Sequence, residues 1–319
     1  MRGLSVGLDE AGIHVHLHLL AVHTMVCVFF ALLTAASNAC AAVLQRKAAA
    51  QVPTERSFHL SLIADLLRRR VWLAGIGMVI VAAVAQAAAL ATGPIALVQP
   101  IFIIELPVTL VLAALVNHNR EKLRQLPWTA IATTTAALGL GLAIAQPSGA
   151  TATASNQSWI IALIVTACFE AVLIISATGT SGEPRAALLG LAAACGYALT
   201  AALIKNSVAD LNTSAQVFFT SWHIYATAVA GVGSLFLLQN ALQAGTLVAS
   251  QPMLTVGDAL ISISYGVTLY SEVLRVGWWL VPEIAALAAI IFGCVQIAKS
   301  PLASEASGLA TETSAKVLL

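Results

Sequence analysis

Acidic side chains in apolar surroundings are the residues of this sequence that could do chemistry. Glu105, Glu170 and Asp258 each stand inside a long run of hydrophobic residues. A carboxylate is expensive to hold in such a place, and a chain that keeps one there uses it to bind a cation, to carry a proton or to pair with a neighbouring helix. These three residues are therefore the first candidates for a substrate or ion site.

Prolines flank the first of these carboxylates. Glu105 lies between Pro100 and Pro107, and each proline removes one backbone hydrogen bond and frees the carbonyl group four residues earlier. Free carbonyl groups beside a carboxylate are typical of ion sites in transporters, so we expect a broken helix here and a second break at Pro252. The alternative is a pair of kinks, with Glu105 hydrogen-bonded to a neighbouring helix.

Two glutamines extend the candidate substrate- or ion-binding site. Gln99 stands directly before Pro100, and Gln251 stands directly before Pro252. Each amide could coordinate a solute, or it could simply hydrogen-bond across helices.

Three alternating histidines, His14, His16 and His18, precede the first apolar run. On a helix His14 and His18 would lie within reach of one metal ion, but an incidental N-terminal segment explains them as well. The sequence leaves a metal site undetermined.

No signature of an enzyme accompanies these residues. The sequence has no Walker loop and no His-Glu-x-x-His zinc motif, and its five cysteines include no Cys-x-x-Cys pair. We therefore expect no enzymatic activity and no cofactor. The net charge of +1 gives no reason to expect nucleic acid as a partner, and homo-oligomer formation stays open.

The elements that must position the carboxylates are membrane-spanning helices. Charged residues make up 9% of the chain and apolar residues 59%, with a mean hydropathy of +0.91, whereas soluble domains contain roughly 25% charged residues. A bilayer takes about 20 apolar residues per helix. The apolar runs predict an all-α bundle of about nine transmembrane helices, at residues 19–44, 71–91, 95–116, 128–145, 159–177, 186–205, 217–238, 253–270 and 279–298.

Basic residues predict the orientation, because Lys and Arg resist translocation. Most of them follow the odd-numbered spans, including the run at residues 68–70. We expect a plasma-membrane (inner-membrane) protein with residues 1–18 outside the cell and a disordered tail, residues 299–319, in the cytoplasm. Residues 58–67 predict an amphipathic stretch at the cytoplasmic interface.

A sequence repeat divides the apolar region into two halves. The pattern Ala-Leu-x-x-Gly-x5-Gln-Pro at residues 89–100 returns at residues 241–252, and Glu-x-Leu-Arg-x3-Trp at residues 121–128 returns at residues 272–279. These matches predict two four-helix repeats, residues 19–146 and 185–298, joined by a linking helix at 158–178. Equivalent helices are then five spans apart, so the repeats must be inverted, as is usual in secondary transporters. A duplication without a transport role is the alternative.

These repeated motifs resemble those of the drug/metabolite transporter superfamily, the EamA-like proteins, over roughly residues 19–298. Within that superfamily, the segments at 43–47 (Val-Leu-Gln-Arg-Lys) and 93–100 (Gly-Pro-x-x-Leu-Val-x-Pro) are similar to the NIPA-type magnesium transporters. The superfamily pattern has ten spans, one more than we predict, whereas nine spans suit the NIPA-like branch.

The resemblance implies a secondary transporter that moves a small solute by alternating access. A transporter of magnesium or another divalent cation is the first alternative. A membrane interaction protein without transport activity is the second.

Overall fold

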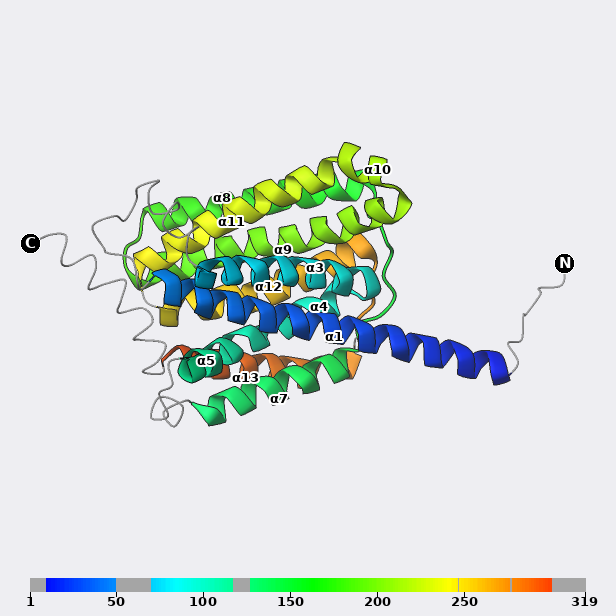
Figure 1. The fold of residues 1–319 in the computed structure, drawn as a ribbon, viewed down its shortest axis with the longest axis horizontal. Helices are drawn as coiled ribbons and strands as arrows, with labels where there is room; N and C mark the ends of the chain where they lie inside the picture. The colour runs from blue at the N-terminus through cyan, green and yellow to red at the C-terminus, as the bar shows by residue number, and fades with distance from the viewer. Residues whose placement is uncertain (1–9, 50–69, 117–126, 246, 276, 300–319) are drawn as a thin grey trace, which may run out of the picture.

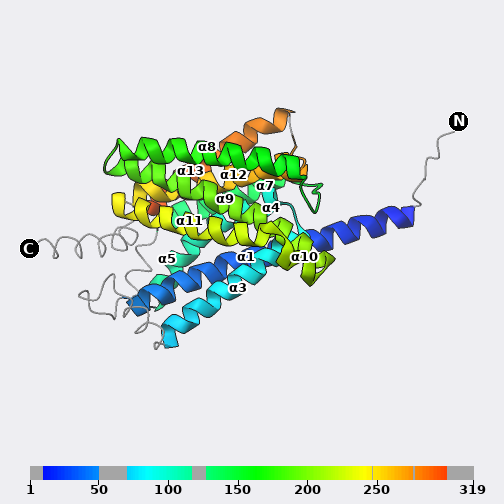
Figure 2. The same cartoon turned by 90° about the horizontal axis from the view of Figure 1, so that it is seen from above.

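The chain folds into a bundle of helices whose long axes run in roughly the same direction (Figures 1 and 2). The computed structural model describes residues 10–49, 70–116, 127–245, 247–275 and 277–299. Its helices are α1 (Glu10–Ala49), α3 (Arg70–Thr92), α4 (Ile95–Ile101), η2 (Phe102–Ile104), α5 (Glu105–Val116), α7 (Trp128–Ala145), α8 (Asn156–Thr178), α9 (Glu183–Thr213), α10 (Ala215–Thr220), α11 (Trp222–Ala244), α12 (Leu247–Tyr270), η3 (Gly277–Trp279) and α13 (Leu280–Ala298). The all-helical class is therefore confirmed for these residues.

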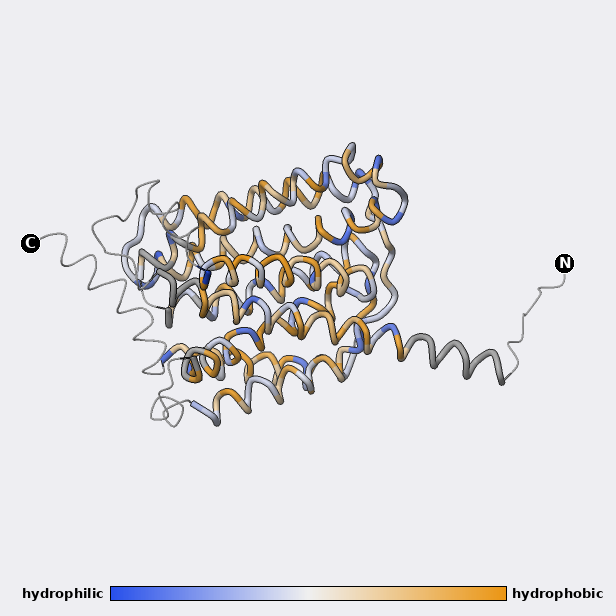
Figure 3. Tube along the Cα trace, in the orientation of Figure 1, coloured by the Kyte–Doolittle hydropathy of each residue, from blue (hydrophilic) through white to orange (hydrophobic). Residues whose placement is uncertain are grey.

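Seven of the described helices are long and apolar enough to cross a membrane, and two shorter apolar stretches, Ile95–Thr109 and Trp222–Leu238, correspond to the other two predicted spans. Large hydrophobic side chains such as Phe29, Ile164 and Val229 lie exposed on the outside of the bundle. Hydrophobic residues predominate along the helices (Figure 3). This surface suits a surrounding of lipid and makes the chain a multi-pass membrane protein.

Two helices extend well beyond the predicted spans. The apolar span of α1 begins at Ala21, but the helix begins at Glu10 and protrudes from the bundle (Figure 1). Similarly, α9 continues past residue 205 to Thr213, because no proline or glycine interrupts it there. The side chains of the three histidines, the stretch at 58–67 and the tail at 300–319 lie outside the described residues.

Small residues let α9 form the centre of the bundle. It contacts α8, α11 and α12, and alanine and glycine fill much of its buried surface. A Cβ atom added at Gly190 of α9 would lie 2.8 Å from the backbone oxygen of Ser250 on α12, and one added at Gly257 of α12 would lie 2.7 Å from Leu191. The two helices therefore pack backbone to backbone. The linking helix α8, in contrast, lies at the edge of the bundle with many apolar side chains exposed.

The helices pair in two similar sets. In the first set α1 packs against α3 and α5, and in the second α9 packs against α11 and α12. The two sets meet where α4 packs against α12 and α7 packs against α13. Following the chain in Figure 1 shows that α1 and α9 run in opposite directions, as do α3 and α11, and α7 and α13. The turn between α3 and α4, the beginning of α8 and the end of α12 lie at one end of the bundle, which we call the Gly93 end.

The close approach of α9 and α12 predicts the effect of a single methyl group. Gly190→Ala should lower the free energy of unfolding by about 1–3 kcal/mol, because the Cβ atom overlaps the Ser250 backbone. The matched control is Gly77→Ala on α3, where nothing lies within 4 Å of the added atom and alanine favours the helix. Thermal unfolding of the detergent-purified variants measures both effects. Equal stability of the two variants would show that α9 and α12 are not in this contact.

Candidate functional site

Glu105 stands at a break in its helix. It is the first residue of α5, directly after the 3-10 turn η2, which lies between Pro100 and Pro107. Pro107 has no N–H, so the carbonyl group of Ile103 inside that turn lacks a helical donor. The Glu105 carboxylate accepts a hydrogen bond from the Asn38 side chain of α1 at 3.2 Å. The break thus places the carboxylate against α1, which orients it.

Asp258 brings a second carboxylate to the same region from α12. The hydroxyl of Ser262, one helical turn later, donates to its Oδ1 at 3.3 Å. The charges of Glu105 and Asp258 act on each other, and both act on Tyr197 of α9. We call these five residues (Asn38, Glu105, Tyr197, Asp258 and Ser262) the carboxylate centre.

Two features of the carboxylate centre limit what it can bind. Among the described residues, no basic side chain acts on either carboxylate. Within the same residues, no three His, Cys, Asp or Glu side chains come together in a way that would hold a metal ion. The centre therefore offers two acidic groups, an amide and a phenol to a cation or to protons.

The remaining predicted site residues lie apart from this centre or are not described. Gln99 is buried in α4, 2% exposed, and its amide nitrogen has no hydrogen-bond partner among the described residues. Glu170 is half-buried on α8, where its charge acts on Cys195 and Tyr265. The side chain of Gln251 lies outside the described residues.

The helix break predicted at Pro252 is wrong. Helix α12 begins at Leu247 and runs through Pro252 without interruption. The proline stands early in the helix, so its missing N–H deprives only the carbonyl group of Val248, close to the helix start. Pro100 and Pro107, in contrast, flank a change of helix type.

A second polar cluster, which sequence reasoning did not identify as a site, lies at the Gly93 end. Glu272 stands two residues after the end of α12. Its carboxylate accepts hydrogen bonds from the backbone N–H groups of Ile95, at 2.6 Å, and Ala96, at 2.8 Å, where α4 begins. The Lys205 ammonium of α9 donates to the Gly93 carbonyl at 2.9 Å and to Glu272 at 3.2 Å. Lys205 is 5% exposed and Glu272 is 3% exposed. We call this arrangement the Lys205–Glu272 lock.

The residues around the lock hold it in place. Tyr270 donates to the Ala202 carbonyl at 2.6 Å, and Lys205 lies 5.1 Å from the centre of the Tyr270 ring, within range of a cation–π interaction. Two features of the sequence pointed toward the lock. Glu272 belongs to the repeated Glu-x-Leu-Arg motif, and Lys205 is one of the few basic residues that do not follow an odd-numbered span. Neither feature shows that the two side chains meet.

A third polar network fastens the ends of α8, α9 and α11. His223 Nδ1 lies 2.9 Å from an Asp210 oxygen, and the Asn206 amide lies 3.2 Å from His223 Nε2. The Asn206 oxygen accepts from the Trp159 indole at 3.4 Å. These polar groups satisfy one another, so we assign the network a structural role.

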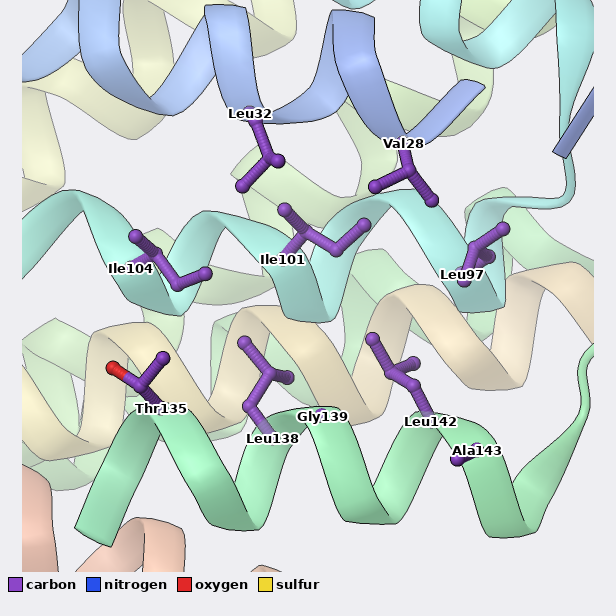
Figure 4. A pocket seen from close by; sticks show the side chains of 10 residues that line it. All are labelled: Val28, Leu32, Leu97, Ile101, Ile104, Thr135, Leu138, Gly139, Leu142 and Ala143. Carbon is purple, nitrogen blue, oxygen red and sulfur yellow. The ribbon is translucent and has the colours of Figure 1, made fainter. Parts of the chain in front are cut away.

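An apolar groove of about 390 Å³ opens between α1, α4 and α7 (Figure 4). Its lining consists of Val28, Leu32, Leu97, Ile101, Ile104, Thr135, Leu138, Gly139, Leu142 and Ala143. Thr135 supplies the polar side chain of this lining, and neither carboxylate of the carboxylate centre belongs to it. The groove suits lipid chains and is distinct from the candidate site.

Comparison with known proteins finds a distant relative. No protein-family model matches the chain, and no solved structure matches it. The chain is 25% identical over 271 residues to an uncharacterised protein of Corynebacterium glutamicum, and the alignment covers 84% of this chain and 93% of the relative. The similarity therefore extends over most of both proteins.

The lock predicts a non-additive effect on stability. Lys205→Met leaves the Glu272 carboxylate buried without its cation and should lower the free energy of unfolding by about 3–5 kcal/mol. Adding Glu272→Gln removes the unpaired charge, so the double variant should lose less stability than the sum of the two single variants. Thermal unfolding in detergent measures the cycle. Strictly additive losses would show that the two charges do not interact.

Proposed function

We propose that this protein is a secondary transporter that moves a small cationic solute across the membrane by alternating access. The observation that carries the proposal is the carboxylate centre, in which α5 and α12 each supply one acidic group to the inside of an apolar bundle. Glu105 and Asp258 are half-buried and have no basic partner among the described residues. Such acidic groups are costly in a membrane and are kept where they bind cations or carry protons.

The pairing of the helices supports an inverted repeat of nine spans. In this arrangement α1, α3, α4–α5 and α7 form one half, and α9, α11, α12 and α13 form the other, with α8 between them. Equivalent helices run in opposite directions in Figure 1. The pairs α4–α12 and α7–α13 join equivalent helices of the two halves, as expected along a two-fold axis. Two such halves can exchange roles and face either side of the membrane.

Exchange of cations on the two carboxylates would drive the cycle. The solute binds while Glu105 and Asp258 are charged, and protons arriving from the other side displace it by neutralising them. Asn38 orients Glu105 through its hydrogen bond, and both Asn38 and Tyr197 can contribute oxygen atoms to the solute. The sequence resemblance to the drug/metabolite transporter superfamily agrees with this cycle, and no enzymatic step is involved.

A divalent cation such as magnesium is the second candidate substrate. The four side chains of Asn38, Glu105, Tyr197 and Asp258 offer oxygen ligands, which Mg²⁺ prefers, and Mg²⁺ keeps part of its water shell and so needs few protein ligands. The segments similar to NIPA-type transporters favour the same substrate.

The proposed setting is the plasma membrane. Residues before α1 lie outside the cell and residues after α13 lie in the cytoplasm, because the basic residues gather on the face that follows the odd-numbered spans. The Gly93 end of the bundle is then the outer end.

Flux measurements on the purified protein in liposomes test the proposed function. We expect uptake of at least one cation from a panel of organic amines and Mg²⁺, and loss of that uptake to background in Glu105→Gln and in Asp258→Asn. Glu283→Gln, the same change at the start of α13, should transport normally. Normal flux in both centre variants would exclude the carboxylate centre as the binding site. Absence of flux for every solute would instead favour the membrane interaction protein.

A further inference from the structure

We infer that the Lys205–Glu272 lock is the gate that closes the Gly93 end of the bundle over the carboxylate centre. The inference rests on the proposed function, because a gate has meaning only if the centre is reached in turn from both sides. It names the contacts that must break for that end to open, which are those of Lys205 and Glu272 with the backbone of Gly93, Ile95 and Ala96.

The lock joins the two proposed halves of the molecule. Its acceptor, Glu272, belongs to the second half, and the N–H groups that it binds belong to α4 of the first half. Lys205 of the second half also reaches across, to the carbonyl group of Gly93. These contacts with α4 and Gly93 must break if the halves separate at this end. The Lys205–Glu272 ion pair can stay intact, because both of its residues belong to the second half.

A single helix connects the lock to the carboxylate centre. Asp258 lies on α12, and Glu272 follows the end of that helix but turns back on it, so that its carboxylate lies against Gly266, about 12 Å from Asp258 along the axis. The Glu272 N–H donates to the Gly266 carbonyl at 2.9 Å, so the segment after the helix is held to its last turns. A movement of α12 that alters the surroundings of Asp258 therefore moves Glu272 relative to α4.

The chemistry of the lock suits an interface that opens and closes. Burying two charges costs desolvation energy that their attraction roughly offsets, so a buried ion pair adds little net stability over the hydrated charges. Opening the lock returns both groups to water, whereas opening an apolar seal would expose hydrophobic surface. While both groups are buried, however, either charge without the other would be strongly destabilising. The closed state is therefore stable only when Lys205 and Glu272 are paired.

The protein carries its own reporter beneath the gate. Cys27 of α1 is fully buried, packs directly against Gly93, and feels the charges of Lys205 and Glu272. Its thiol should become reachable from the Gly93 end only when the lock opens.

Alkylation of Cys27 tests the gate without any substrate. The background replaces Cys40, Cys168, Cys195 and Cys294 with alanine, and the reagent is a membrane-impermeant maleimide applied to cells. Glu272→Gln removes the charge of the lock and should speed labelling by about tenfold or more, because the closed state loses its main electrostatic contact. Glu283→Gln is the matched control and should leave the rate unchanged. Equal labelling rates in the Glu272→Gln variant and its parent, with both eluting as folded protein in size exclusion, would overturn the inference.

A reversible crosslink tests the same gate with both lock residues intact. Ser148 and Val273 form an isolated antiparallel β-bridge, with hydrogen bonds of 3.1 and 2.8 Å in the two directions. Directly opposed residues of this kind lie within the Cα separation of a disulfide. In a background free of other cysteines, Ser148→Cys with Val273→Cys should form a disulfide that ties the segment carrying Glu272 to the segment directly after α7, the last helix of the first half.

The crosslinked protein should lose transport and recover it when a reductant cleaves the disulfide. Full transport with the disulfide intact would show that this end does not open and would overturn the inference, even if the Glu272 variant failed to fold. The two proposals fail separately. Absence of flux in the parent protein would count against transport, whereas unchanged Cys27 labelling beside normal flux would count against this gate alone.

Discussion

The cost of holding charge inside an apolar bundle is the constraint on which the rest of this structure depends. Where water is scarce, a carboxylate needs donors or a cation, and without them it tends to take up a proton. The lock meets this need within the protein, since Glu272 has two backbone donors and Lys205. Among the described residues the carboxylate centre meets it only in part, since Asn38 donates to Glu105 and Ser262 donates to Asp258. That difference is the reason why we propose the carboxylate centre, and not the lock, as the binding site.

Backbone packing explains how both clusters can be built from the same few helices. Gly190 and Gly257 allow α9 and α12 to lie in contact, so Tyr197 and Lys205 on one helix reach the acidic groups on or beside the other. Helix α4 packs on α12, and Pro100 of α4 and Pro107 of α5 flank the turn after which Glu105 meets α1. Helix α12 therefore connects the two clusters, since it carries Asp258 and is followed directly by the segment that holds Glu272.

Sequence reasoning predicted the membrane character of the chain and the helix ends to within a few residues at α3 and α7. It also selected Glu105 and Asp258, whose role as a site stays a prediction. Periodic features carry such information, since a bilayer demands long apolar runs and penalises any charge inside them. The lock escaped because Lys205 and Glu272 are 67 residues apart and meet only through tertiary packing. The prediction at Pro252 was wrong for a related reason. A proline interrupts a helix in its interior but is tolerated near its start, and the sequence does not show where α12 starts.

The central claim is that two inverted halves each bring one carboxylate to a shared centre. The most direct measurement maps the membrane sides of Lys122 and Val273, which occupy equivalent positions in the repeated Glu-x-Leu-Arg-x3-Trp motif. Single cysteines at these positions, in a background without other cysteines, are treated with an impermeant thiol reagent before and after permeabilisation of the cells. Inversion predicts that position 273 reacts in intact cells and that position 122 reacts only after permeabilisation. Reaction of both positions from the same side would contradict the account.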